Sequence, residues 1–581
     1  MKDLLRYLKN YKLCSVLAPL FKLLEAAFEL IIPLVVAAIV DKITAVQDGV
    51  AAAGDGTTFV VYMCLLLVGL GIIGLVSAVS AQYFAAKAAV GFSKELRSDL
   101  FGKMQTLSYY EIDGLGTSAM ITRMTSDVNQ IQTGVNLVLR LFMRSPFIVF
   151  GAMVMAFVLS VTAGWVFAVT IAVLFVVVFG IMLVTIPMYR KTQGYLDRVT
   201  AATRETLVGS RVVRAFCKEE EEISEYDRRN QRLTASQKAV GRISALMNPL
   251  TYAIINAGII VLIYVGALKV DGGSLTQGQV VALYNYMSQI LIELIKLANL
   301  IITVTKCFAS ADRVNEILKM NPSLVHGESA KLTDGAPFIT FDGVSMKYNK
   351  GGMEALSDIS FSVEKGQTVG IIGGTGSGKT TLVNLIPHFY DASEGQVLID
   401  GQNVNSLGDE ELRNMCGIVP QRAVLFKGTI RDNLKWGNEN ATDEEIMTAV
   451  NYACAADVIN SKPDGLDEMV EQGGKNFSGG QRQRLTIARA LVRKPEILIL
   501  DDSASALDYA TDARLRNNLR LLDYNPTVFI VSQRTSSIHH ADKILVLDGG
   551  RLVGCGKHAE LLKNCEVYRE IYESQYGKEG A

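Results

Sequence analysis

Six long apolar stretches in the first 310 residues constrain the fold of this 581-residue chain more than any other feature. Each can supply the about 20 apolar residues that cross the hydrocarbon layer of a bilayer. The stretches are Leu13–Val40, Thr57–Val90, Val138–Ser160, Gly164–Tyr189, Met247–Val270 and Gln277–Val304. Buried helices of a soluble core are the alternative, but six such lengths in succession favour a lipid bilayer around a six-helix membrane domain.

Positive charge indicates how these helices are oriented. Basic residues precede the first stretch: Lys2, Arg6, Lys9 and Lys12. The connections 91–137 and 190–242 are long and basic, whereas the loops on the opposite side are short or acidic. Because Lys and Arg stay on the cytoplasmic side, both termini are expected in the cytoplasm. The two long connections predict membrane helices that continue into the cytoplasm and turn near Gly114–Thr122 and Gly209–Phe216.

The composition changes after residue 310. Pro and Gly interrupt the segment 311–337, which is expected to be a linker, and alternating strands and helices are expected over 338–581. The predicted fold is therefore an all-α six-helix transmembrane domain (1–310) followed by an α/β domain. A net charge of −1 gives no reason to expect a nucleic-acid partner, and the eight scattered cysteines indicate neither disulfides nor a metal.

A phosphate-binding loop follows the apolar strand 368–372. Its residues are Gly373, Gly374, Thr375, Gly376, Ser377, Gly378, Lys379 and Thr380. This is a complete GxxxxGK[ST] pattern between a strand and a helix that opens at Thr381. The glycines let backbone N–H groups approach phosphate oxygens, and Lys379 brings a positive charge to them. The Thr380 hydroxyl is placed to bind Mg²⁺, so the pattern predicts binding of ATP or GTP with magnesium.

Two further residues extend this site. Asp501 ends the apolar strand 497–500 and can hold Mg²⁺, which prefers oxygen ligands. Tyr348 precedes the phosphate loop and is expected to stack on adenine, although a lone tyrosine can also serve only for packing. The predicted α/β domain is thus a P-loop ATP-binding cassette.

The run Phe477, Ser478, Gly479, Gly480 and Gln481 resembles the LSGGQ signature of the ATP-binding-cassette (ABC) family, with Phe in the first place. The whole chain resembles a bacterial half-transporter of the exporter type. The resemblance implies that this signature closes on the ATP of a second half-transporter. It also implies that Gln421 touches Mg²⁺, that Asp508 lies at the dimer interface, and that the two cytoplasmic turns are coupling helices.

Two positions depart from the family pattern. The general base of the family is a glutamate directly after the magnesium-binding aspartate, and Asp502 stands there. The switch histidine is replaced by Gln533, and the segment Val470–Gly473 also differs from the common exporter pattern. The chain therefore resembles the degenerate-site subunit of a heterodimeric exporter. A homodimer with two slow sites is the alternative.

Charged residues within the apolar stretches are the candidates for substrate contact. They are Lys22, Glu25, Glu29, Glu293 and Lys296. Pairs three residues apart on a helix can neutralise each other. Glu29 is then the excess carboxylate expected to attract a cationic substrate, with Glu293 as a second cavity candidate.

The sequence predicts ATP-driven export of small amphipathic compounds, drug-like or lipid-like, across the bacterial cytoplasmic membrane. A mainly regulatory ATP-binding subunit and a homodimeric lipid or peptide exporter are the alternatives.

Overall fold

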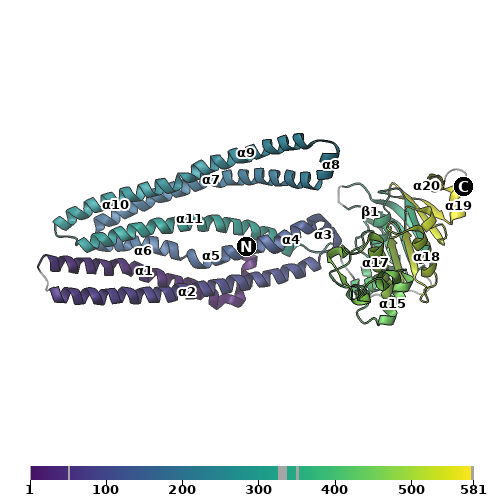
Figure 1. The fold of residues 1–581 in the computed structure, drawn as a ribbon, viewed down its shortest axis with the longest axis horizontal. Helices are drawn as coiled ribbons and strands as arrows, with labels where there is room; N and C mark the ends of the chain where they lie inside the picture. Colours follow the sequence, from purple (N-terminus) through teal and green to yellow (C-terminus); the bar gives the residue numbers. More distant parts are fainter. Residues whose placement is uncertain (1, 50–52, 325–326, 328–336, 349–351, 577–581) are drawn as a thin grey trace. The chain divides into compact units, whose positions relative to one another are not determined.

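The computed structural model describes residues 2–49, 53–324, 327, 337–348 and 352–576, which divide into two compact units (Figure 1). One unit comprises residues 1–105 and 117–320, and the other comprises 106–116 and 321–581. The first is helical and the second is built on β-sheets, as the sequence predicts. The first unit continues to Met320 because its last helix runs past residue 310. Of the expected linker 311–337, residues 311–319 belong to this last helix, whereas 325–326 and 328–336 lie outside the described residues.

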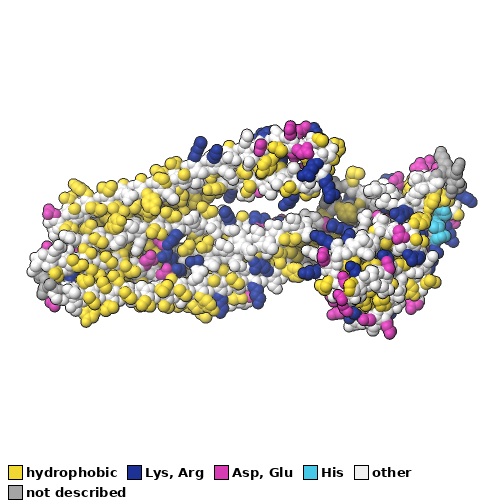
Figure 2. All heavy atoms as spheres, viewed as in Figure 1, with side chains coloured by type: hydrophobic (Ala, Val, Ile, Leu, Met, Phe, Trp, Pro, Cys, Tyr) yellow, Lys and Arg dark blue, Asp and Glu magenta, His cyan; other side chains and the backbone are white. Residues whose placement is uncertain are grey.

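Four of the helices that the structure describes in the first unit have 36 residues or more, well beyond the about 20 that a membrane span requires. In chain order they are η1 (Lys2–Tyr11), α1 (Lys12–Gln47), α2 (Ala53–Gln105), α4 (Thr117–Thr122), η2 (Arg123–Asp127), α5 (Val128–Leu141), α6 (Arg144–Leu159), α7 (Val161–Val208), α8 (Ser210–Ala215), α9 (Glu219–Ala245), α10 (Met247–Asp271) and α11 (Gln277–Lys319). Five helical segments of the described chain are long and apolar enough to cross a membrane by length and composition. The sixth predicted stretch lies in α11, which carries Glu293 and Lys296. Hydrophobic side chains cover much of the surface of these helices (Figure 2).

Local sequence explains where several of these helices begin and meet. The third predicted stretch is interrupted between α5 and α6, so that Arg144 becomes the first residue of α6. Thr276 caps α11 by accepting a hydrogen bond from the backbone N–H of Gln279. A Cβ atom on Gly278 would lie 2.0 Å from the carbonyl oxygen of Ala37, so only glycine lets α1 and α11 approach this closely.

Helix α7 forms a long hairpin with α9 and α10, and the short helix α8 lies at the turn between α7 and α9 (Figure 1). The turn falls at Gly209–Phe216, where the sequence predicts it. Large apolar side chains around this turn are exposed to solvent: Leu207, Val208, Val212 and Phe216. The other predicted turn begins earlier than expected, because the short helix α3 (Tyr109–Leu115) already starts at Tyr109 rather than near Gly114.

The second unit contains three sheets and the helix α3. The strands are β1 (Ile339–Met346), β2 (Leu356–Val363), β3 (Thr368–Gly373), β4 (Glu394–Ile399), β5 (Gln402–Asn403), β6 (Cys416–Val419), β7 (Gly428–Thr429), β8 (Met469–Val470), β9 (Ile497–Asp501), β10 (Thr527–Val531), β11 (Lys543–Asp548) and β12 (Arg551–Gly556). The larger sheet has the order β12-β11-β3-β10-β9-β6, and the four-stranded sheet has the order β2-β1-β4-β5.

The second unit also contains helices in addition to α3. They are α12 (Lys379–Leu385), α13 (Asp409–Met415), α14 (Ile430–Lys435), α15 (Asp443–Tyr452), α16 (Ala456–Asn460), α17 (Gly479–Val492), α18 (Tyr509–Leu519), α19 (His558–Asn564) and α20 (Glu566–Tyr576), with the short turns η3 (Val404–Ser406), η4 (Gly465–Asp467), η5 (Gln472–Gly474) and η6 (Thr535–Ser537). The strands β3, β10 and β9 are parallel neighbours, with Val531 opposite both Ile371 and Asp501. Their carboxyl ends therefore meet at one edge of the sheet, where ligands of such folds bind.

Candidate nucleotide-binding site

The phosphate loop joins β3 to α12 at that edge. Gly378 has φ +93°, and a Cβ atom there would lie 2.6 Å from the carbonyl oxygen of Ala355, so the position requires glycine. The Lys379 ammonium donates hydrogen bonds to the carbonyl oxygens of Gly373, at 2.9 Å, and Gly374, at 2.6 Å. Burial lowers the pKa of Lys379, and the carboxylates of Asp502 and Asp501 oppose that shift. The loop thus holds the Lys379 ammonium at the place where the phosphate oxygens of a nucleotide would bind.

Two of the proposed magnesium ligands lie together, Asp501 at the end of β9 and Thr380 in the first turn of α12. The Thr380 hydroxyl donates to the carboxylate of Asp501, 3.1 and 3.0 Å from its two oxygens. Asp501 is buried, and burial raises its pKa, with the neighbouring Asp502 adding to the shift. A hydroxyl and a carboxylate on one side of a glycine-rich loop are the oxygen donors that Mg²⁺ prefers, so these residues fit a magnesium nucleotide.

Asp502 occupies the position of the expected base. Its backbone is in the left-handed region, with φ +47°, and its N–H donates to the carbonyl oxygen of Val531 at 3.0 Å. The side-chain amide of Gln421 donates to the Asp502 carboxylate at 3.3 Å. Burial raises the pKa of Asp502, while Gln421 and Lys379 lower it. The structure therefore brings Lys379, Asp501, Asp502 and Gln421 together at this edge of the sheet.

Gln533 lies two residues beyond β10 and is exposed. A residue that sequence reasoning missed holds its backbone: Gln575 of α20 donates to the carbonyl oxygen of Gln533 at 2.7 Å. The side-chain oxygen of Gln575 accepts from the backbone N–H of Thr535 at 2.9 Å. No motif marks Gln575, because its role depends on a contact 42 residues away in sequence.

The signature forms the N-terminus of α17. Ser478 is the N-cap, and Ser478 and Gln481 hydrogen-bond each other's backbone N–H groups in a capping box, at 3.3 and 2.9 Å. Free N–H groups and the helix dipole make such an N-terminus favourable for an anion. Phe477 is buried beneath this turn, with the Lys462 ammonium 4.8 Å from the centre of its ring, so its side chain anchors the signature instead of reaching out. Asp508 caps α18 in the same way, accepting from the Thr511 N–H at 2.8 Å.

Tyr348, the expected adenine platform, is partly exposed and its hydroxyl lies 3.0 Å from that of Thr381. The edge of its ring meets Tyr390, with 5.2 Å between ring centres. The Tyr390 hydroxyl donates to Asp113 of α3 at 2.5 Å. Sequence reasoning missed Tyr390, which links the adenine platform to the short helix between α2 and α4.

A second polar cluster lies inside the helical unit. Arg144 donates to Glu293 at 2.6 Å and to Glu29 at 2.7 Å, and it lies 3.7 Å from Glu25. Lys22 pairs with Glu25 and Lys296 pairs with Glu293, as their spacing predicts. The three carboxylates are thus balanced by three cations. The expectation that Glu29 is an excess carboxylate is wrong, because Arg144 at the start of α6 was overlooked.

Two family models match the chain: the ABC transporter transmembrane region over residues 15–294 and the ABC transporter model over residues 356–505. An uncharacterized ABC transporter ATP-binding protein, YfiB of Bacillus subtilis, is 35% identical over 582 residues, covering 100% of both chains. The chain belongs to the ABC transporter family. Both the fold class and the predicted ATPase are thereby confirmed.

Relatives with assigned names and a solved structure indicate the branch of the family. An ATP-dependent lipid A-core flippase of Desulfotalea psychrophila is 34% identical over 83% of this chain and 84% of its own. YheI of Bacillus subtilis, a probable multidrug resistance ABC transporter, is 33% identical over 83% of each chain. The structure of a bacterial Atm1-family ABC exporter with ATP bound matches with a TM-score of 0.81 and 25% identity, covering 97% of this chain and 98% of that one. This ABC transporter is therefore an exporter that couples ATP hydrolysis to transport across a membrane.

Proposed function

We propose that this chain is the degenerate-site half of a heterodimeric exporter of amphipathic compounds in the bacterial cytoplasmic membrane. One observation carries the proposal: the residues that hold nucleotide are complete, whereas the two that act on the γ-phosphate are altered. Lys379 and Asp501 are buried; Lys379 is bonded to the carbonyl oxygens of the loop, and Thr380 is bonded to Asp501. Asp502 and Gln533 stand at the base and switch positions.

Asp502 is poorly suited to take a proton from water. Its side chain is one methylene shorter than glutamate, and its backbone cannot follow, because the N–H is bonded to Val531. A general base must come within about 2.6–3.2 Å of the proton it removes. A displacement of about 1 Å can cost on the order of 100-fold in rate. Gln533 can donate a hydrogen bond but has no imidazole, so the site is expected to bind ATP and hydrolyse it slowly.

Two surfaces of the chain support assembly with a second subunit. The N-terminus of α17 is preformed by Ser478 and Gln481, and its anion-binding groups serve a nucleotide held elsewhere. The turn at α8 exposes Val212 and Phe216, and a contiguous apolar surface of this kind favours a protein partner. In the proposed assembly both turns are cytoplasmic coupling helices and both termini lie in the cytoplasm.

The proposed substrate class follows from the relatives, one named as a flippase of lipid A-core and another as a probable multidrug resistance protein. Both names fit a compound with polar and apolar parts. Within the cluster Glu29 keeps the more exposed side chain, 37% against 3% for Glu293. Glu29 therefore stays the candidate for contact with a cationic group, and Glu293 is assigned to holding the helices together.

The test compares the chain alone with the chain co-expressed with its partner half-transporter. Vanadate-sensitive ATPase activity in proteoliposomes should be low for the chain alone and high for the pair. Equal turnover would contradict the degenerate-site proposal and favour a homodimer.

A double variant tests whether slow hydrolysis comes from the altered residues of this chain or from the lack of a partner subunit. Asp502→Glu combined with Gln533→His restores the longer carboxylate and the imidazole. In the pair, ATPase activity should rise by up to about twofold, because a second site becomes competent. Dye efflux per ATP hydrolysed should fall, since ATP would no longer be held between cycles. A pair that hydrolyses ATP without any substrate efflux would instead assign the chain a regulatory role.

A further inference from the structure

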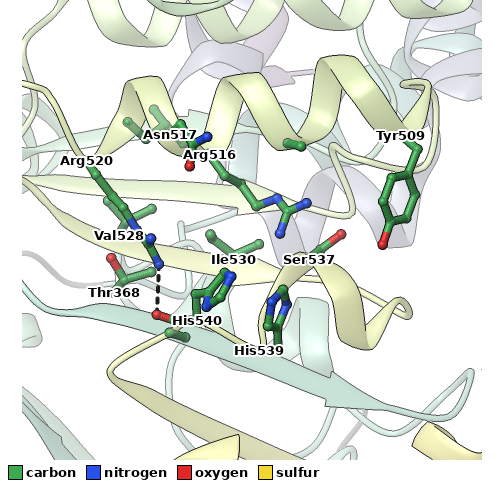
Figure 3. A pocket seen from close by; sticks show the side chains of 13 residues that line it. Thr368, Tyr509, Arg516, Asn517, Arg520, Val528, Ile530, Ser537, His539 and His540 are labelled. Atoms are coloured by element: carbon green, nitrogen blue, oxygen red, sulfur yellow. Dashed lines mark hydrogen bonds between the residues drawn. The ribbon is translucent and has the colours of Figure 1, made fainter. Parts of the chain in front are cut away.

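A pocket of about 260 Å³ lies between α18 and the segment that follows β10 (Figure 3). Four basic side chains line it: Arg516, Arg520, His539 and His540. Among the described residues that line the pocket, none is an aspartate or a glutamate. Three of the five histidines of the chain are grouped here, because His558 lies 6.0 Å from His539 between ring centres. None of these residues takes part in the nucleotide site.

Several donors of these side chains are not used by the fold. Arg520 donates one hydrogen bond, to the carbonyl oxygen of His540 at 2.9 Å, and forms no ion pair within the described part of the chain. Its guanidinium has five N–H groups in a fork that matches an oxyanion. His539 is held through Nδ1, 2.8 Å from the carbonyl oxygen of Ser536, which leaves Nε2 as a further donor when the ring is protonated.

Arg520 is the arginine of the pocket that has no carboxylate partner within the described residues. Arg516 pairs with Asp512 at 3.1 Å and also donates to the carbonyl oxygens of Asp512 and Ser536, so its charge is balanced. Asp542, at the rim, accepts from the backbone N–H of Thr368 at 2.8 Å. Burial lowers the pKa of His540, and His539, Arg520, Arg516 and His558 lower it further by their charge. An anion among these groups would relieve that repulsion.

The floor of the pocket is apolar. Val528 and Ile530 of β10 line it, together with Leu519 of α18, and all three are buried. A cavity of about 260 Å³ is several times the about 30 Å³ that one water occupies in the liquid. The site therefore has room for more than a bare oxyanion. Its rim offers charge-assisted hydrogen bonds, and its floor offers an apolar surface for the rest of a ligand.

We propose that this pocket is a second anion-binding site, separate from the nucleotide site, that takes a small phosphate ester. The phosphate lies between Arg520 and His540, and the organic part covers Val528 and Ile530. Charge-assisted hydrogen bonds from a guanidinium to phosphate are short and strong, and Arg520 uses only one of its donors within the described part of the chain. The ligand class is defined by its phosphate group, and the two probes below distinguish free phosphate from an ester.

The experiment measures binding of inorganic phosphate and of phenyl phosphate to the purified full-length protein by isothermal titration calorimetry. Saturating AMP-PNP with Mg²⁺ fills the nucleotide site, and NaCl keeps the ionic strength constant. Phenyl phosphate should bind saturably and more tightly than phosphate. Absence of saturable binding would contradict the proposal of an anion-binding site. Equal affinity for both probes would contradict the proposal that the apolar floor binds the organic part of the ligand.

Variants on one helix give the matched control. Arg520→Gln should weaken phenyl phosphate binding at least about tenfold, because a charge-assisted hydrogen bond is lost. Arg514→Gln, an exposed arginine on the same helix outside the pocket, should leave the affinity unchanged. His540→Gln provides a second, independent variant if Arg520→Gln lowers the melting temperature. Equal weakening by Arg514→Gln would show general attraction of anions and contradict the proposal.

Discussion

Replacing Arg144 by methionine tests whether the charge cluster holds the membrane helices together. Arg144 connects α6 to Glu29 on α1 and to Glu293 on α11 through hydrogen bonds of 2.7 and 2.6 Å. Methionine fills similar space without the charge. After the change Glu293 keeps the Ser145 hydroxyl, at 2.7 Å, and the Lys296 ammonium, at 2.8 Å. Glu29 loses its described partner and keeps a side chain that is 37% exposed.

The cost follows from these contacts. Breaking a buried ion pair by removing one partner costs about 3–5 kcal/mol, mostly because a buried charge is left uncompensated. Two partners of Glu293 remain and Glu29 is partly exposed, so we expect the lower part of that range, about 3 kcal/mol. Arg144→Lys keeps the positive charge but loses the guanidinium fork that bonds Glu29 and Glu293 at once. It should therefore lower the free energy of unfolding by less than Arg144→Met does. Combining Arg144→Met with Glu29→Gln removes the carboxylate that has lost its described partner and should recover part of the loss.

The assay is reversible unfolding in mixed SDS and dodecylmaltoside micelles followed by tryptophan fluorescence. The chain has two tryptophans, and a Trp436→Phe background leaves Trp165 of α7 as the reporter of the helical unit. Arg190→Met, which removes an exposed arginine of α7, is the control and should change the free energy of unfolding by less than about 0.5 kcal/mol. A loss below about 1 kcal/mol for Arg144→Met, or a double variant no more stable than the single one, would refute the role of the cluster.

Three further changes probe the cassette. Ser478→Ala should reduce ATPase turnover of the pair more than Asp502→Asn does, because Ser478 is proposed to serve the competent site; the reverse order would mean that the two sites are assigned wrongly. Asp501→Asn should raise the melting temperature of the nucleotide-free protein at pH 7. Burial raises the pKa of Asp501 in the folded state, so the ionised carboxylate destabilises the fold. This destabilisation is absent below the unfolded pKa and grows as the pH rises through the folded pKa. The increase in melting temperature from Asp501→Asn should therefore vanish near pH 3. Tyr390→Phe keeps the ring but loses the hydrogen bond to Asp113, and substrate-stimulated ATPase activity should fall while ATP affinity is retained; unchanged stimulation would exclude Tyr390 from coupling.

The nucleotide site was predictable because its chemistry is carried by local sequence. A strand, a glycine-rich loop and a helix N-terminus fix the positions of Lys379 and Thr380 within a few residues of backbone. The end of another parallel strand then fixes Asp501, since carboxyl ends of parallel strands share an edge. The same locality explains the correct placement of the turn at Gly209–Phe216, where helix formers give way to glycine.

Residues whose roles depend on distant contacts were not predictable in this way. Arg144 lies in an apolar stretch and meets partners 115 and 149 residues away, on two other helices. The Tyr390 hydroxyl contacts Asp113 of α3, 277 residues away in sequence. Gln575 contacts Thr535, close to the switch position Gln533 and 40 residues away in sequence. Pairing charges within single helices predicted the Lys22–Glu25 and Glu293–Lys296 pairs but left Glu29 without a cationic partner. Only the packing of α1, α6 and α11 supplies the missing cation.

The pattern of retained and altered residues also constrains how the exporter works. The groups expected to bind phosphate and magnesium are present and hydrogen-bonded here, so we expect the energy of ATP binding to be retained. Ser478 and Gln481 satisfy each other within the chain, so the signature keeps its geometry without a partner. The altered residues include the two positions expected to orient water and sense the γ-phosphate, together with the segment Val470–Gly473. In the proposed heterodimer such a subunit would complete the partner's site in every cycle while its own nucleotide stays bound. The nucleotide that stays bound would hold the two cassettes together between cycles, which predicts one ATP hydrolysed per transport event.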